Sequence, residues 1–355
     1  MEKDTSTGDW TVGIDLGDRR SAICALDEQA EVRKRFSVAT TATGIAKAVS
    51  GYPGSRVVLE VGTHSPWVSR QLQALGHETV VANPRRVRTI AANDDKSDEV
   101  DAELLARLGR ADTKLLRPIQ HRGETAQRDR SILGVRDGLV RARASLINQA
   151  RGQAKALGLR LPRCATESFA GRMRREGLEE SYPGMSSLVE MTHQLTQQIR
   201  ALEREIEELA AQRYPETALL RQVAGVGPIT SLAYVLTLED PHRFARSRSV
   251  GAYLGMRPKR RQSGKEDPLL RITKAGDPFL RRLLVQSAQY ILGPFGPDTA
   301  LRRFGERLIA RGGRAARKKA LVAVARKLAV LLHRLWVTGE LYEPLRGVAS
   351  QTAEA

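Results

Sequence analysis

Four acidic residues fall where metal-dependent chemistry on a phosphodiester would need them: Asp15, Glu60, Asp98 and Asp101. The first two lie at or near the ends of predicted strands, at residues 11–16 and 56–61. A carboxylate in an otherwise apolar strand is costly to bury unless it is paired or holds a metal. The other two are three residues apart at the start of a predicted helix, so they share one face.

Such a set gathers negative charge that divalent cations can stabilise, and Mg²⁺ (or Mn²⁺) suits oxygen ligands. Two ions about 4 Å apart would activate an attacking oxygen and stabilise the leaving one. Acids in a first helical turn also favour the helix dipole. The helical pair Asp98 and Asp101 is therefore weak evidence alone, and the ordered set of strand Asp, strand Glu and helix Asp-x-x-Asp supports the interpretation.

Alternating strand and helix patterns precede and follow these acids. Strands are predicted at 11–16, 21–26, 33–38, 56–61 and 78–81, and helices at 43–49, 66–75 and 100–108. The β-branched run at 56–61 is typical of a buried parallel strand, whereas the first two strands resemble a hairpin. The pattern predicts an α/β domain with a mixed sheet, and the four acids fall where the sheet of an RNase H-like nuclease would present them.

The middle and end of the chain are predicted to be helical. A long basic helix covers residues 122–157, and residues 188–209 carry an apolar seam of about three heptads. That seam needs a partner helix, either from the same chain or from a second copy. Residues 219–238 read as helix, Gly turn, helix. This resembles a helix-hairpin-helix, which can hold a phosphate, but it is also a common neutral motif. A polar loop at 255–268, helices at 278–292 and 315–336, and a loose tail after 345 follow.

Composition favours a nucleic-acid partner. The 355 residues include 58 Lys and Arg against 40 Asp and Glu, a net charge of +18. That excess indicates a polyanion, nucleic acid first and an acidic membrane surface second. No stretch reaches the roughly 20 apolar residues of a membrane span, and the N-terminus lacks a signal-peptide core. The two cysteines, Cys24 and Cys164, fit a reducing compartment, and Cys24 is predicted to lie in the core.

Several short motifs resemble those of a known family. They read VGID at 12–15, LEVGT at 59–63, KSDEVDA at 96–102, AGVGP at 224–228, RF at 243–244, AYLGMRP at 252–258, QSG at 262–264 and ITKAGD at 272–277. In this order they resemble the insertion-sequence transposases that join an N-terminal RuvC-like DEDD domain to a C-terminal transposase domain. The resemblance spans roughly residues 10–340.

The resemblance implies a DNA recombinase that uses a serine of its C-terminal domain to attack the DNA phosphate. The matching position is Ser263. A serine hydroxyl needs a base or a metal to draw off its proton, and no histidine is nearby in sequence, so the metal held by the acids is the expected activator. From local sequence alone, a turn in a basic DNA-contacting loop is the favoured interpretation of Ser263-Gly264, and the family resemblance reverses that preference. The nucleic-acid-binding residues expected around it are Arg257, Lys259, Arg260, Arg261, Lys265 and Lys274.

The resemblance further implies a catalytic domain at 10–120, a helical and coiled-coil dimerisation region at 121–213, a C-terminal transposase domain at 214–345 and a tail at 346–355. Its implied partners are donor and target DNA, a guide (bridge) RNA and further copies of the chain, as a dimer or tetramer formed through the coiled coil. The surplus of cations suits a long phosphate backbone. We expect a cytoplasmic, nucleoid-associated prokaryotic protein without a membrane partner.

Three other functions compete. A structure-specific nuclease that uses water would need the four acids but not Ser263. A sugar- or acetate-kinase-like phosphotransferase also opens on strand-Gly-Ile-Asp-Leu-Gly, but the charge, the pair Arg19-Arg20 and the missing second Gly-rich loop argue against it. A non-catalytic nucleic-acid-binding protein would use the acids only as helix and turn caps.

Overall fold

The computed structural model describes residues 10–85, 97–261 and 270–346. The chain divides into two compact units between Arg122 and Gly123, and each is described by itself. Within the described ranges, no helix is long and apolar enough to cross a membrane.

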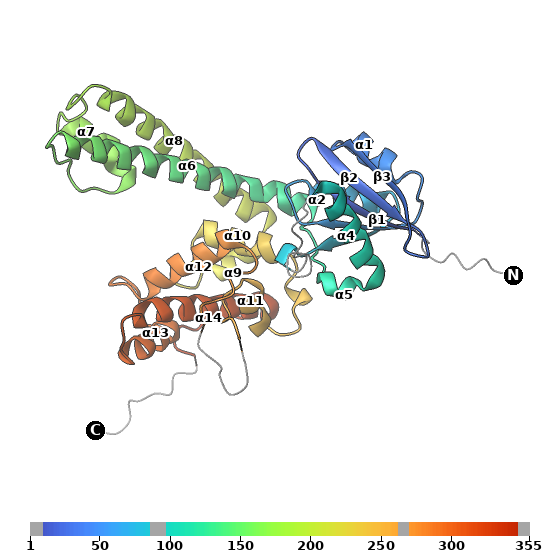
Figure 1. The fold of residues 1–355 in the computed structure, drawn as a ribbon. Helices are drawn as coiled ribbons and strands as arrows, with labels where there is room; N and C mark the ends of the chain where they lie inside the picture. Colours follow the sequence, from blue (N-terminus) through green and yellow to red (C-terminus); the bar gives the residue numbers. More distant parts are fainter. Residues whose placement is uncertain (1–9, 86–96, 262–269, 347–355) are drawn as a thin grey trace, which may run out of the picture. The chain divides into compact units, whose positions relative to one another are not determined.

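The first unit is built on a five-stranded mixed sheet (Figure 1). Its strands are β1 (Thr11–Asp15), β2 (Arg20–Leu26), β3 (Val32–Ala39), β4 (Arg56–Glu60) and β5 (Glu78–Ala82). Their order is β3-β2-β1-β4-β5; the first three pair antiparallel, and β1, β4 and β5 pair parallel. The predicted mixed sheet is therefore confirmed.

Helices cover both faces of this sheet, which explains why Val57, Val58 and Leu59 of β4 are all fully buried. The helices of the unit are α1 (Ala42–Val49), α2 (Ser65–Ala74), α4 (Asp98–Ala111) and α5 (Thr113–Leu116). Helices α1 and α2 share a core with one face of β1 and β4, and α4 packs on the other face. The predicted helix at 100–108 is longer than expected because the side chain of Ser97 caps it, accepting a hydrogen bond from the Val100 amide.

The second unit begins with a helical hairpin (Figure 1). Its elements are α6 (Glu124–Ala156), the short helices η1 (Thr166–Ser168) and α7 (Phe169–Arg175), and α8 (Met185–Arg213). Ile206 of α8 shares a core with Leu133 of α6, and Val189 shares one with Ile147. Thr192, Ile199 and Ile206 of the predicted seam are thus buried within this chain, whereas the four leucines of the seam remain half-buried.

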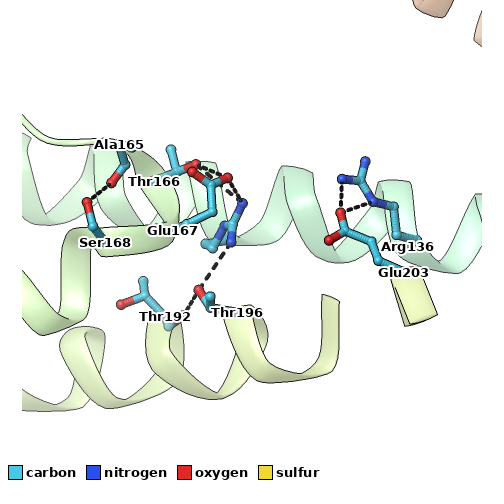
Figure 2. Close-up of polar contacts among 9 residues, drawn as sticks. Arg136, Ala165, Thr166, Glu167, Ser168, Thr192, Thr196 and Glu203 are labelled. Carbon is cyan, nitrogen blue, oxygen red and sulfur yellow. Dashed lines mark hydrogen bonds and ion pairs between the residues drawn. The ribbon is translucent and has the colours of Figure 1, made fainter. Parts of the chain in front are cut away.

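Polar pairs cross the hairpin at a constant register (Figure 2). Arg136 donates to Glu203 at 3.1 Å through Nε. One heptad further along α6, Arg143 is only 3% exposed and donates to Thr196 at 3.2 Å and to Glu167 at 2.7 Å. Removing the partner of a buried charge is costly, so these contacts fix the alignment of the two helices.

The remainder of the second unit is a helical bundle. Its helices are α9 (Glu216–Leu220), α10 (Pro228–Leu238), η2 (Pro241–Arg243), α11 (Arg248–Tyr253), α12 (Pro278–Ile291), α13 (Ala300–Ala310) and α14 (Ala316–Thr338). Tyr234 is fully buried in the bundle core and donates its hydroxyl to the Ala329 carbonyl at 2.6 Å. Helix α13 was not predicted from the sequence.

Candidate active site

Asp15 and Glu60 end two neighbouring strands at the same edge of the sheet. The parallel register pairs Ile14 with Leu59, and its next step sets Asp15 beside Glu60. Adjacent strands lie about 4.8 Å apart. Both acidic residues are partly buried. Two of the four predicted ligand positions are therefore neighbours on a rigid frame.

Both acids also belong to the face of the sheet that α4 covers. A Cβ atom on Gly13 would lie 2.0 Å from the Ala102 carbonyl oxygen, and one on Gly109 would lie 2.2 Å from a Val58 methyl. Side chains two residues apart on a strand share a face. Asp15 follows Gly13 by two positions and Glu60 follows Val58 by two, so both belong to the α4 side.

Helix α4 runs opposite to β1 and β4. Its C-terminal part meets the start of β4, where Arg56 donates to the Gly109 carbonyl at 3.1 Å. Its N-terminal turn therefore approaches the edge where the strands end. From the Gly13–Ala102 contact, Asp98 is about 6 Å further along the helix and Asp15 about 7 Å further along the strand, in the same direction. The fold brings all four predicted positions to one edge.

Ion pairs anchor α4 against the strands. Glu103 accepts hydrogen bonds from Arg35 of β3 and from Arg107, the latter at 2.7 Å. Burial acts to raise the pKa of Glu103, but these hydrogen bonds and charges outweigh it and hold the pKa below its usual value. Arg110 donates to the Glu28 carbonyl at 2.6 Å. The helix that carries Asp98 and Asp101 is thus held along its length.

His64 also lies at this edge and was missed by sequence reasoning. It follows β4 by four residues, and its Nδ1 accepts a hydrogen bond from the Trp67 indole at 3.1 Å. Its Nε2 is 3.7 Å from the carboxylate of Asp18, in the loop after β1. The contact joins the loops that follow Asp15 and Glu60. A lone histidine in a turn gives no sequence signal for such a role.

An all-carboxylate set fits a hard divalent cation such as Mg²⁺ or Mn²⁺ by its donor chemistry. In the part of the chain that the structure describes, no three His, Cys, Asp or Glu side chains converge with metal-site geometry. The four positions share an edge, whereas their side chains are not gathered into a coordination sphere. Residues 86–96, which precede α4, lie outside the described residues.

The second predicted centre is the polar loop of the second unit. Ser263 and Lys265 lie outside the described residues, but the segments that flank them form a short antiparallel ribbon. Pro258 pairs with Ile272, and the Lys259 amide donates to the Arg271 carbonyl at 2.9 Å. The Thr273 amide donates to the Arg257 carbonyl at the same distance.

Two glycines lock the base of this ribbon. Gly255 and Gly276 have φ of +69° and +71°, which favours glycine. A Cβ on Gly255 would lie 2.1 Å from the Ala275 carbonyl oxygen, and one on Gly276 would lie 2.1 Å from that of Tyr253. The backbone segments before α12 and after α11 therefore touch directly, which holds the two ends of the loop together.

The ribbon is strongly basic. Of the predicted nucleic-acid-binding residues, the described ones are exposed: Arg257, Lys259, Arg260, Arg261 and Lys274. Arg271 was not predicted, although it lies directly opposite Lys259 and so shares its face. Only the strand register reveals this pairing, because the two residues are distant in sequence.

Two families of known proteins match this chain, one in the part that contains the sheet and one in the part that contains the ribbon. Residues 12–157 match the family described as "Transposase", of the DEDD type found in IS110, and residues 217–303 match "Transposase IS116/IS110/IS902 family". The chain is 30% identical over 291 residues to the transposase for insertion sequence element IS1328 of Yersinia enterocolitica, covering 78% of this chain and 82% of that one. It is 27% identical over 350 residues to the transposase for IS1111A of Coxiella burnetii, covering 93% and 90%.

Proposed function

Because the chain belongs to the IS116/IS110/IS902 transposase family, we propose that it is an RNA-guided DNA recombinase of an insertion sequence. The observation that supports this best is the meeting of Asp15, Glu60 and the N-terminal turn of α4 at one edge of the sheet. The sheet order, with an antiparallel β3-β2-β1 and parallel β4 and β5, supports a RuvC-like fold for residues 10–120.

In this proposal Asp15, Glu60, Asp98 and Asp101 hold Mg²⁺ or Mn²⁺. When bound, the metal neutralises charge on the phosphodiester and lowers the pKa of the attacking hydroxyl. We expect Asp15→Asn to lower Mg²⁺-dependent strand cleavage by at least about 100-fold. Glu31→Gln is the matched control, because Glu31 is exposed in the turn between β2 and β3, at the opposite end of the sheet. Equal losses in both variants would contradict the assignment.

Ser263 is proposed as the nucleophile. A bond forms between Ser263 Oγ and the phosphorus, the bond to one sugar oxygen breaks, and that oxygen leaves with a proton. Arg257, Lys259 and Arg271 would stabilise the developing charge from the flanking ribbon. With labelled element-end DNA and Mg²⁺, a protein–DNA adduct that survives denaturation should form in the wild type and be absent in Ser263→Ala.

Thr273→Ala is the control for that experiment, since Thr273 is on the same ribbon and is not a proposed nucleophile. Cleavage without an adduct, unaffected by Ser263→Ala, would favour the water-using nuclease. We propose that residues 214–345 form the C-terminal transposase domain that contains Ser263, and that residues 346–355 are a tail.

We propose that a guide RNA selects the DNA sequences on which the protein acts, through base pairing as in other RNA-guided systems. The net charge of +18 supports binding to a long phosphate backbone. A transcript of the element end should bind more tightly than an unrelated RNA of equal length. Equal binding of the two would contradict specific guidance.

Self-association through residues 121–213 is proposed from the outer surface of the hairpin. Half-buried leucines outside the described cores stand one heptad apart on both helices: Leu139 and Leu146 on α6, and Leu195 and Leu202 on α8. Such stripes are suited to further helices. Leu139→Lys with Leu195→Lys should convert the dimer or tetramer to a monomer in light scattering. Wild-type chain that is already monomeric would contradict this.

A further inference from the structure

A groove lies beside the outer strand of the sheet, and its lining includes none of the residues of either predicted centre. It has a volume of about 630 Å³ and separates β3 from α1 and the turn after it. Strand β3 is at the end of the sheet order, so within the described residues no strand pairs with its outer edge. The volume falls in the usual range for ligand pockets, ~300–1,000 Å³.

The groove combines cations with aromatic rings. Arg20, Lys34 and Lys47 line it, as do Phe36 and Tyr52, and none of its described lining residues is acidic. The Lys34 ammonium is 5.2 Å from the centre of the Phe36 ring, so a face of that ring meets positive charge. Cations that track phosphates beside rings that stack on bases are the features of single-strand binding.

One end of the groove reaches the edge that carries the acidic residues. Arg20 starts β2 and pairs with Ala39 of β3, two register steps beyond the pairing of Asp15 with Ala22. Since β2 runs antiparallel to β1, Arg20 lies past the end of β1. Its guanidinium reaches back to Ser37, which stands in register with Ala22 and therefore with Asp15, and Ser37 accepts hydrogen bonds from it through its hydroxyl at 2.7 Å and its carbonyl at 3.0 Å. A DNA strand leaving that edge would meet Arg20 first.

The geometry points to a binding groove for single-stranded DNA, with phosphates on Arg20, Lys34 and Lys47 and a base stacked on Phe36 or Tyr52. DNA is the favoured occupant because the groove begins at the edge of the same domain that carries the acids. The inference goes beyond the proposed reaction, because binding can be measured without metal, guide RNA or Ser263.

Binding of a fluorescent oligothymidylate of about 12 nucleotides to the full chain in EDTA tests it. Lys34→Glu with Lys47→Glu should weaken this binding about tenfold or more, while a duplex of equal length is affected less than about twofold. Lys114→Glu with Arg117→Glu is the matched control, because both residues are exposed cations of the same unit outside the groove. This control should leave the single-strand preference unchanged.

A second measurement locates the contact. The same oligonucleotide carrying 5-iodouracil should crosslink under ultraviolet light to Phe36 or Tyr52. Phe36→Leu should remove the crosslink at residue 36, and because Phe36 packs against the core of its unit, a circular dichroism spectrum equal to that of the wild type is the check that this variant is folded. Crosslinks found only outside residues 20–52, or equal losses for single strand and duplex, would overturn the proposal. Tighter binding of oligouridylate, lost in the same groove variants, would overturn the choice of DNA in favour of RNA.

Discussion

The edge with the four acidic residues and the basic ribbon are held by different kinds of structure. The edge is set by paired strands and by a helix pressed against them at Gly13 and Gly109. The ribbon has one bridge, a few backbone hydrogen bonds and a base fixed at Gly255 and Gly276. The first is therefore inseparable from the stability of its unit, whereas the second can change without unfolding its unit. The variants below test this difference.

The largest effect is expected at Gly13. In Gly13→Val, the new side chain meets the Ala102 carbonyl and the Ala106 backbone, so α4 must move. We expect a loss on the order of 4 kcal/mol in the free energy of unfolding, measured by urea denaturation. Gly62→Ala is the control, because nothing lies within 4 Å of its Cβ position. If Gly13→Val unfolded at the same urea concentration as the wild type, the edge would not depend on the contact between α4 and β1.

A smaller and more local effect is expected at Gly276. Gly276→Ala forces a Cβ against the Tyr253 carbonyl at a φ of +71°, so the base of the ribbon must open. DNA capture through Ser263 should fall at least about tenfold while the helical circular dichroism is kept. Gly177→Ala is the control. Gly177 has a similar φ of +63°, but nothing lies within 4 Å of its Cβ position, so this variant measures the backbone strain alone, about 1 kcal/mol. If Gly276→Ala and Gly177→Ala lowered DNA capture equally, the contact between the two backbone segments at the base of the ribbon would be unimportant.

Asp277 links the ribbon to the long hairpin. It caps α12 by accepting from the Phe279 and Leu280 amides at 2.9 and 3.0 Å, and it accepts from Arg130 of α6 at 2.6 Å. Asp277→Ala should cost about 2 kcal/mol in the free energy of unfolding, and Asp277→Asn less, because asparagine keeps the cap. Thermal denaturation separates the two. Identical losses would mean that the cap contributes nothing.

The smallest effect is a pH dependence at the base of the hairpin, outside both regions. Burial and a 2.6 Å hydrogen bond to Asp129 raise the pKa of Tyr214 to about 12. Because the folded-state pKa lies above the unfolded value of about 10, this stability is present below pH 10 and is lost as the pH rises toward 12. The loss should stay below about 2 kcal/mol because the ring is partly exposed.

Urea midpoints between pH 9 and 11.5 measure this dependence, and Tyr214→Phe should flatten it. Metal-dependent cleavage and DNA capture at pH 8 should not change in that variant. A loss of either activity would tie the hairpin base to one of the two regions.

Much of the first unit was predictable because its signals are local. Five strands and their neighbouring helices follow from alternating apolar runs, and β4 was recognised as buried and parallel. The approach of α4 to Gly13 was not predictable, since it depends on contacts between distant segments. The family assignment was correct, while the roles of the individual site residues remain predictions.

The second unit was harder to predict from sequence. Helix α13 was missed because arginines interrupt its short apolar pattern, and its Thr299 cap follows a Gly- and Pro-rich stretch. The seam of α8 was recognised, but sequence could not decide which helix covers it. The burial of Arg143 was not predictable, since nothing local in the sequence indicates Glu167 and Thr196 as its partners.

The constant register of the hairpin makes it a spacer of adjustable length. Its base is closed independently by Arg213, which donates to Asp129 at 2.9 Å. Because Arg136 and Arg143 contact Glu203 and Thr196, which are one heptad apart on α8, deleting one heptad from each helix preserves the facing residues. The tip would then retract by about 10 Å. A graded set of such deletions would serve as a molecular ruler for whatever the tip must reach.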